Sequence, residues 1–94
     1  DQILMRKLLR RIPETLPKYI FDIKKLDKKD DKEDIAKQAH GIKGLAANCS
    51  AKRLHLAAKS LELAAKDGDV EGIKVLLARI EKESEELLHH ILAL

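Results

Sequence analysis

Apolar residues recur at steps of three and four along nearly all of this 94-residue chain, and no stretch alternates apolar with polar residues. The first pattern places apolar side chains on one face of an α-helix, whereas strict alternation is typical of a β-strand. The composition agrees, because the chain is rich in Leu, Ala, Lys and Glu but has one Phe, one Tyr and no Trp. We therefore predict an all-α protein.

Residues that break helices divide this pattern into segments. Pro13 and Pro17 are expected to interrupt or kink the first stretch. The polar run 27–32 and the sequence Asp-Gly-Asp at 67–69 are typical of turns. The expected helices span residues 2–12, 14–28, 32–48, 51–66 and 70–92. Together they predict one domain over residues 1–94, an antiparallel up-down four-helix bundle with an extra N-terminal helical segment.

The expected turns carry residues that favour helix ends. Asp30 or Asp31 is suited to cap the helix that begins at 32, because its carboxylate can accept a hydrogen bond from a free backbone N–H. Ser50 and Asp69 are suited to cap the two following helices in the same way. Gly68 is expected to adopt the left-handed conformation that ends the helix before it.

Composition and charge argue against several classes of function. The net charge is only +3 and basic residues are scattered among acids, so with two aromatic rings we expect no nucleic-acid binding. We expect no membrane contact, because the longest apolar run is only a few residues. A lone Cys49 cannot form an internal disulfide, which fits a reducing cytoplasm.

Four other side chains have structural interpretations. His55 lies beside the apolar stripe of its helix and is expected to be structural or merely exposed. His89 and His90 are consecutive, so they lie about 100° apart on a helix and are poorly placed to chelate together. Ser84 occupies an apolar position of the last helix, where we expect its hydroxyl to bond back to a carbonyl of its own helix.

The stretch Ala39–Asn48 carries the most chemical information. At about 100° per residue around a helix axis, one set of positions falls within roughly 40° and forms a buried stripe: Ile35, Ala39, Ile42, Ala46 and Cys49. His40 lies roughly 140° from the first of these, so its imidazole is predicted to face solvent. Lys43 and Gly44 follow it at i+3 and i+4, and the small Ala47 comes one turn later.

An exposed His beside a lysine suits few kinds of chemistry. A general base needs an orienting acid, and no Asp or Glu lies three or four residues from His40. A metal site needs further ligands at helical spacing, and no other His lies there. A nucleophile for a phosphoryl group needs an accessible neutral nitrogen and a nearby cation, which Lys43 supplies. Gly41 and Gly44 each cost about 1 kcal/mol in a helix interior. Packing suggests no reason for them, so we infer that they clear room for another protein.

Two stretches resemble the signature of histidine-containing phosphotransfer (HPt) domains of bacterial multistep phosphorelays. They read AHGIKGLAANCSAKRL (39–54) and SLELAAKDGD (60–69). Four elements occur at the spacing of that signature: the His-x-x-Lys-Gly core, the small residues after it, the Leu61-Glu62 pair and the closing Gly68-Asp69. The family often has Gly where this chain has Ser50.

The resemblance implies a four-helix bundle that carries phosphate. His40 would accept a phosphoryl group from the aspartyl phosphate of a receiver domain and pass it to the aspartate of another, with Lys43 as the cation beside the phosphate. The expected docking residues are Lys37, Gly41, Gly44 and Ala47. Mg²⁺ and the acidic pocket belong to the receiver, so neither a cofactor nor a metal is expected here.

The same resemblance implies a phosphoryl carrier without kinase activity. We expect a cytoplasmic monomer whose partners are the receiver domains of response regulators. Because the chain opens on Asp1 within a helical pattern, we expect it to come from a longer protein, such as a hybrid sensor kinase whose cytoplasmic part holds this domain.

Other interpretations stay open. The N-terminal phosphotransfer domain of chemotaxis kinases shares the His-x-x-Lys-Gly core, but it usually carries aromatic residues after the motif. A histidine kinase dimerisation domain has an acid directly after its His and a later Pro, whereas this chain has Gly41 and no Pro beyond Pro17. A helical docking module without chemistry would use the glycine-flanked face to bind a partner helix.

Overall fold

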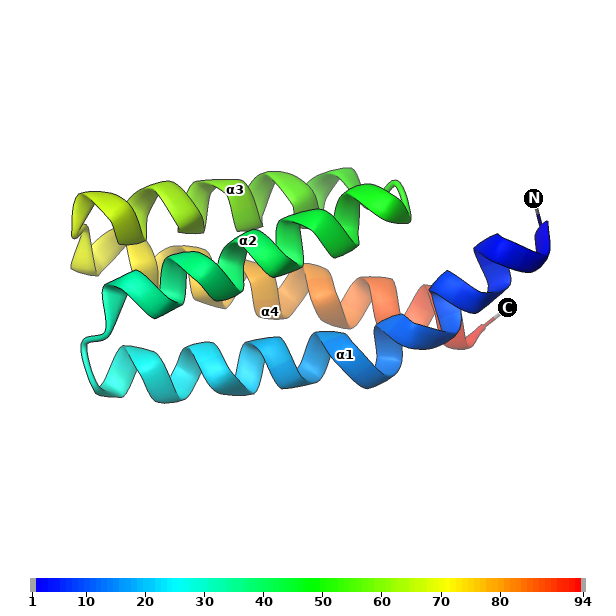
Figure 1. Ribbon diagram of the computed structural model, residues 1–94, viewed down its shortest axis with the longest axis horizontal. Helices are drawn as coiled ribbons and strands as arrows, with labels where there is room; N and C mark the ends of the chain where they lie inside the picture. Colours follow the sequence, from blue (N-terminus) through cyan, green and yellow to red (C-terminus); the bar gives the residue numbers. More distant parts are fainter. Residues whose placement is uncertain (1, 94) are drawn as a thin grey trace.

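The computed structural model describes residues 2–93, so Asp1, on which an expectation of the sequence analysis rests, and Leu94 lie outside the described range. Its helices are α1 (Gln2–Lys28), α2 (Lys32–Asn48), α3 (Lys52–Asp67) and α4 (Val70–Leu92). Consecutive helices run in opposite directions and pack as a bundle (Figure 1), and no strand occurs in residues 2–93. This confirms the predicted all-α bundle. None of these four helices is long and apolar enough to cross a membrane.

The prediction of separate helices over 2–12 and 14–28 is wrong, because α1 is one continuous helix that contains both Pro13 and Pro17. A proline removes one backbone hydrogen bond and crowds the carbonyl four residues earlier, which bends a helix without having to end it. The two prolines lie one turn apart and neither is buried, so the carbonyls they leave unpaired can turn toward water. Figure 1 shows the first turns of α1 bent away from the line of the rest of the helix.

The core is built from the apolar stripes of all four helices. Ile12, Leu16 and Ile23 of α1 are buried, as are Ile73, Leu77 and Ile80 of α4. The buried residues of α2 and α3 include many alanines: Ala36, Ala39, Ala46, Ala57, Ala58, Ala64 and Ala65. These small side chains let the two helices approach closely, and α2 and α3 share the largest contact in the bundle. A side chain of α3 can therefore reach across to the solvent-facing edge of α2.

Helix ends follow the predicted chemistry at two of the three turns. Asp31 caps α2 by accepting a hydrogen bond from the backbone N–H of Asp34 at 3.2 Å. Asp69 caps α4 by accepting one from the N–H of Gly72 at 2.9 Å. Gly68 ends α3 with φ of 69°, in the left-handed region. These three predictions are confirmed.

The third turn differs from the prediction. Ala51, not Ser50, stands at the N-cap of α3, and no side chain caps that helix. Ser50 instead adopts a left-handed conformation with φ of 60°. The short connection from α2 to α3 needs a residue with positive φ, which glycine adopts most readily. The position at which the resembled family often has Gly therefore keeps that backbone conformation here with a serine.

Ser84 is buried as expected, but its hydroxyl is not bonded back to its helix. Only 2% of the residue is exposed, and its Oγ has no hydrogen-bond partner among the described residues. Ser84 lines a surface pocket in the seam between α1 and α4, which Pro17 and Ile20 line from the side of α1. The predicted bond to a carbonyl is therefore wrong.

Candidate functional site

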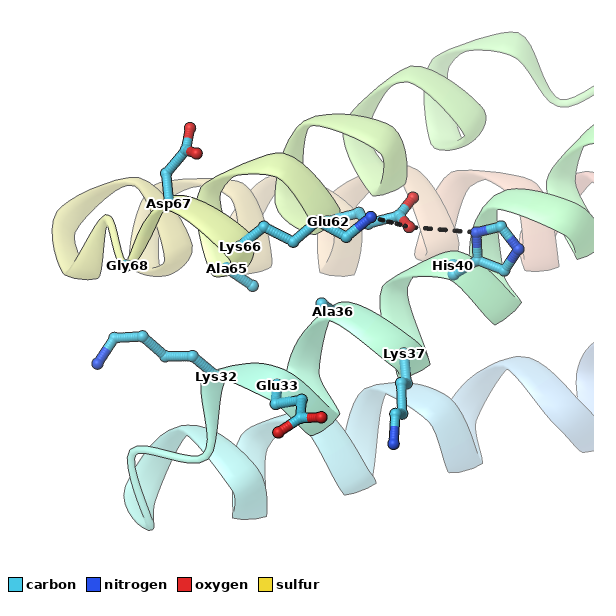
Figure 2. A pocket seen from close by; sticks show the side chains of 10 residues that line it. All are labelled: Lys32, Glu33, Ala36, Lys37, His40, Glu62, Ala65, Lys66, Asp67 and Gly68. Carbon is cyan, nitrogen blue, oxygen red and sulfur yellow. Dashed lines mark hydrogen bonds and ion pairs between the residues drawn. The ribbon is translucent and has the colours of Figure 1, made fainter.

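His40 lies near the middle of α2 and points out of the bundle. Its side chain is 66% exposed, whereas the neighbouring Ala39 and Ile42 are fully buried. This is the orientation that helix geometry predicts. Figure 2 shows the imidazole at the edge of α2 that faces α3.

A carboxylate from α3 supports the imidazole. The Nδ1 atom of His40 lies 3.2 Å from Oε2 of Glu62, whose side chain is only 11% exposed. This partner was not predicted from the sequence, because Glu62 lies on another helix and not within one turn of His40. A signal was nevertheless present, since Glu62 directly follows Leu61 on a helix face made otherwise of Leu and Ala.

Two lysines complete the surroundings of this carboxylate. Lys43 Nζ donates to Oε1 of Glu62 at 2.9 Å, and Lys66 Nζ lies 3.2 Å from Oε2. The hydrogen bond from Lys43 contributes most to lowering the pKa of Glu62 from 4.5 to about 2; Lys66 and His40 add to the effect and burial opposes it. Glu62 is therefore ionised at neutral pH. Lys43, expected only beside a phosphate, is thus also the main counter-ion of a buried acid.

The ionised carboxylate determines which nitrogen of His40 is free to react. A carboxylate without a proton only accepts hydrogen bonds, so Nδ1 must be the donor in this contact. In the neutral ring the lone pair then resides on Nε2, on the opposite side of the imidazole. Because the ring is largely exposed, Nε2 and its lone pair are accessible to a second protein.

The two glycines beside His40 have different surroundings. A Cβ atom at Gly41 would lie 2.6 Å from a ring carbon of Tyr19, which packs over it from α1. The inference that packing suggests no reason for Gly41 is therefore wrong. At Gly44, by contrast, a Cβ atom would meet nothing within 4 Å. Gly44 faces open space, as do the exposed Lys37 and Ala47 on the same helix.

An open groove runs between α2 and α3 on one side of His40 (Figure 2). It has a volume of about 830 Å³, and Ala36 and Ala65 lie among its lining residues. The lysines that line it are Lys32, Lys37 and Lys66. Of the expected docking residues, only Lys37 borders this groove, because Gly44 and Ala47 lie further along α2.

His55 of α3 has a structural contact. Its Nδ1 donates to the backbone carbonyl of Lys43 at 3.1 Å, since a carbonyl oxygen only accepts. The bond joins α3 to α2 one turn beyond His40, which supports the structural interpretation. Elsewhere in residues 2–93, no group of three or more His, Cys, Asp or Glu side chains is arranged to hold a metal ion.

A helical bundle with an exposed imidazole that contacts a carboxylate, itself paired with two lysines, has the features of a phosphoryl carrier. The sequence profile of the Hpt domain matches residues 5–91, so the chain belongs to the Hpt domain family. Domains of this family take part in histidine phosphotransfer in phosphorelay signalling; they interact with receiver domains and are phosphoryl carriers, not autonomous kinases. Comparisons with curated proteins and with solved structures gave no match.

Proposed function

We propose that His40 is the residue that carries the phosphoryl group. It takes the group from the aspartyl phosphate of one receiver domain and passes it to the aspartate of another. The observation that supports this most is the contact between Nδ1 and the ionised Glu62, because it leaves Nε2 exposed with its lone pair. No other His in residues 2–93 has a carboxylate partner of this kind.

The transfer balances without a cofactor on this chain. The lone pair of Nε2 attacks phosphorus, the P–O bond to the receiver aspartate breaks, and the aspartate leaves with the electron pair. The proton on Nδ1 stays in place, so the ring gains positive charge while the phosphoryl group carries two negative charges. Glu62 accepts the hydrogen bond from Nδ1 and stabilises the positive ring. Mg²⁺ and the acidic pocket that activate the phosphoryl group belong to the receiver.

Lys43 supports the same reaction from beside the ring. Its ammonium group has three N–H donors, of which the bond to Oε1 of Glu62 needs one. The lysine can therefore hold the carboxylate and also donate to an oxygen of the transferred phosphoryl group. Its side chain is 26% exposed, so a docked receiver would remove it from most of the remaining water.

The receiver docks on the outward face of α2 around His40. Gly44 and Ala47 let the two proteins approach closely, and Lys37 offers a cation to the acidic rim of the receiver. Gly41 acts indirectly, because it makes room for Tyr19 next to the site. We expect the domain to work as a monomer in the cytoplasm, free or as part of a hybrid sensor kinase.

Transfer from a phosphorylated receiver in the presence of Mg²⁺ tests this proposal. The wild-type chain should gain label that is stable to base and labile to acid, as expected for phosphohistidine. The His40→Gln variant should gain none, yet keep the wild-type circular dichroism and melting temperature because the ring is outside the core. His55→Gln is the matched control and should still accept label. Label on His40→Gln, or unfolding of that variant, would refute the assignment; a chain that no receiver labels would be a docking module.

A further inference from the structure

Lys66 contacts Glu62 but was not among the expected site residues. It lies one turn after Glu62 on α3, and its Nζ is 3.2 Å from Oε2. That same oxygen lies 3.2 Å from Nδ1 of His40. Lys66 and His40 therefore share a single carboxylate oxygen. Lys66 also lines the groove beside the imidazole, and Figure 2 shows its side chain extending along α3 toward the contact with His40.

The two lysines on this carboxylate differ in how firmly they are held. Lys43 is 26% exposed and lies 2.9 Å from Oε1, which His40 does not use. Lys66 is 61% exposed and has the longer contact, on the oxygen that it shares. The lysine of this pair is mostly exposed to water, which weakens its attraction to Glu62, and its flexible four-carbon stem lets it leave at low cost. Lys43 is the fixed counter-ion of Glu62, and Lys66 is the movable one.

Phosphorylation of His40 changes the charges around Glu62. The ring becomes positive, so its Nδ1–H satisfies Oε2 of Glu62 more strongly than before. The phosphoryl group on Nε2 adds two negative charges at the exposed edge of the site. An ammonium group at the shared oxygen is then less needed there, and the new charge of the phosphoryl group attracts it.

We propose that Lys66 is a second phosphate-binding residue, which leaves Glu62 and donates to the phosphoryl oxygens once His40 is phosphorylated. The inference rests on the proposed function of His40. It assigns the two lysines different tasks: Lys43 holds the carboxylate that orients the ring in both states, and Lys66 stabilises the phosphorylated state alone. Lys66 therefore favours retention of the phosphoryl group on this domain over its return to the receiver.

The phosphorylated domain provides a direct test of proximity. Phosphoramidate serves as the donor, because it phosphorylates imidazoles without a receiver, and the ³¹P resonance of phospho-His40 is followed against pH. A cation near a phosphoryl group favours loss of its last proton. We expect the acid dissociation constant of this group to fall about threefold in Lys66→Met. Lys66→Arg should restore it, and Lys74→Met, which removes the same charge from an exposed position on α4, should leave it unchanged.

The equilibrium with a receiver provides the second readout. With Mg²⁺ present, the ratio of phosphorylated domain to phosphorylated receiver should be about three- to fivefold lower for Lys66→Met than for wild type. Equal dissociation constants and equal ratios in wild type and Lys66→Met would overturn the proposal for Lys66. Phosphorylation of His40→Gln to the wild-type level would instead overturn the assignment of His40, so the two failures are distinct.

Discussion

Two interfaces of the bundle differ in whether their buried polar group has partners. One is the interface between α2 and α3, and the other is the interface of α1 with α4. At the first, Glu62 is a buried, ionised carboxylate that contacts His40, Lys43 and Lys66. At the second, the buried hydroxyl of Ser84 has no partner among the described residues. A buried polar group without partners only costs stability, whereas one with several charged partners can orient chemistry. The comparison indicates that α3 supplies the chemical surroundings of His40 and that α1 supplies mainly packing.

The largest expected effect is on stability in acid. The folded chain lowers the pKa of Glu62 from 4.5 to about 2, so its contribution to stability is fully present above pH 4.5 and is lost as the pH falls through about 2. Between neutral pH and the acid end of this range, the wild type should lose about 3 kcal/mol more of its unfolding free energy than Glu62→Gln, which cannot titrate at this position. Urea unfolding at several pH values measures this. If both chains lost the same unfolding free energy in acid, the charged partners of Glu62 would not stabilise the interface between α2 and α3.

The next effect is on transfer itself. Glu62→Gln replaces the charged acceptor of the Nδ1–H bond by a neutral amide, so the positive ring that forms during transfer loses its counter-charge. A charge-assisted hydrogen bond of this kind contributes about 1.5–3 kcal/mol, which predicts transfer from a phosphorylated receiver about ten- to a hundredfold slower. Rapid-quench measurement with Glu71→Gln, an exposed glutamate of α4, as control gives the rate. Transfer at the wild-type rate in Glu62→Gln would show that the carboxylate is only structural.

The two glycines of α2 should respond in opposite directions. In Gly41→Ala the new methyl group would meet the ring of Tyr19, and overpacking costs about 1–3 kcal/mol, against which alanine regains about 1 kcal/mol of helix propensity. We expect a net loss of stability in thermal or urea unfolding. Gly44→Ala has open space and should gain up to about 1 kcal/mol. Stabilisation by both substitutions would mean that Tyr19 moves aside freely.

The smallest effect is expected in the seam between α1 and α4. Ser84→Ala removes a buried hydroxyl that has no partner in the described chain, so it should raise the unfolding free energy by about 1 kcal/mol. Ser60→Ala, at an exposed position of α3, carries the same change in helix propensity without the burial and is the matched control. A loss of stability in Ser84→Ala alone would show that the hydroxyl is hydrogen-bonded after all.

The parts of the structure that depend on one helix at a time could be predicted from the sequence. The spacing of apolar residues predicts which face of α2 is buried and that His40 points outward, and local turn chemistry predicts the caps at Asp31 and Asp69. Contacts between helices could not be derived in this way. The partner of His40 is 22 residues away on another helix, and the residue that explains Gly41 is Tyr19 on a third.

Helix α1 continues through two prolines, but its two parts should differ in how readily they unfold. Upstream of Pro13, Ile12 is buried but Ile3, Leu4 and Met5 are largely exposed. Segments with few buried side chains open at low free energy, so the amide hydrogens there should exchange with solvent long before those around Ile23. The first three turns can then unwind and re-form on their own while the surroundings of His40 stay folded, because those surroundings are set by α2, α3 and the part of α1 around Tyr19, beyond both prolines.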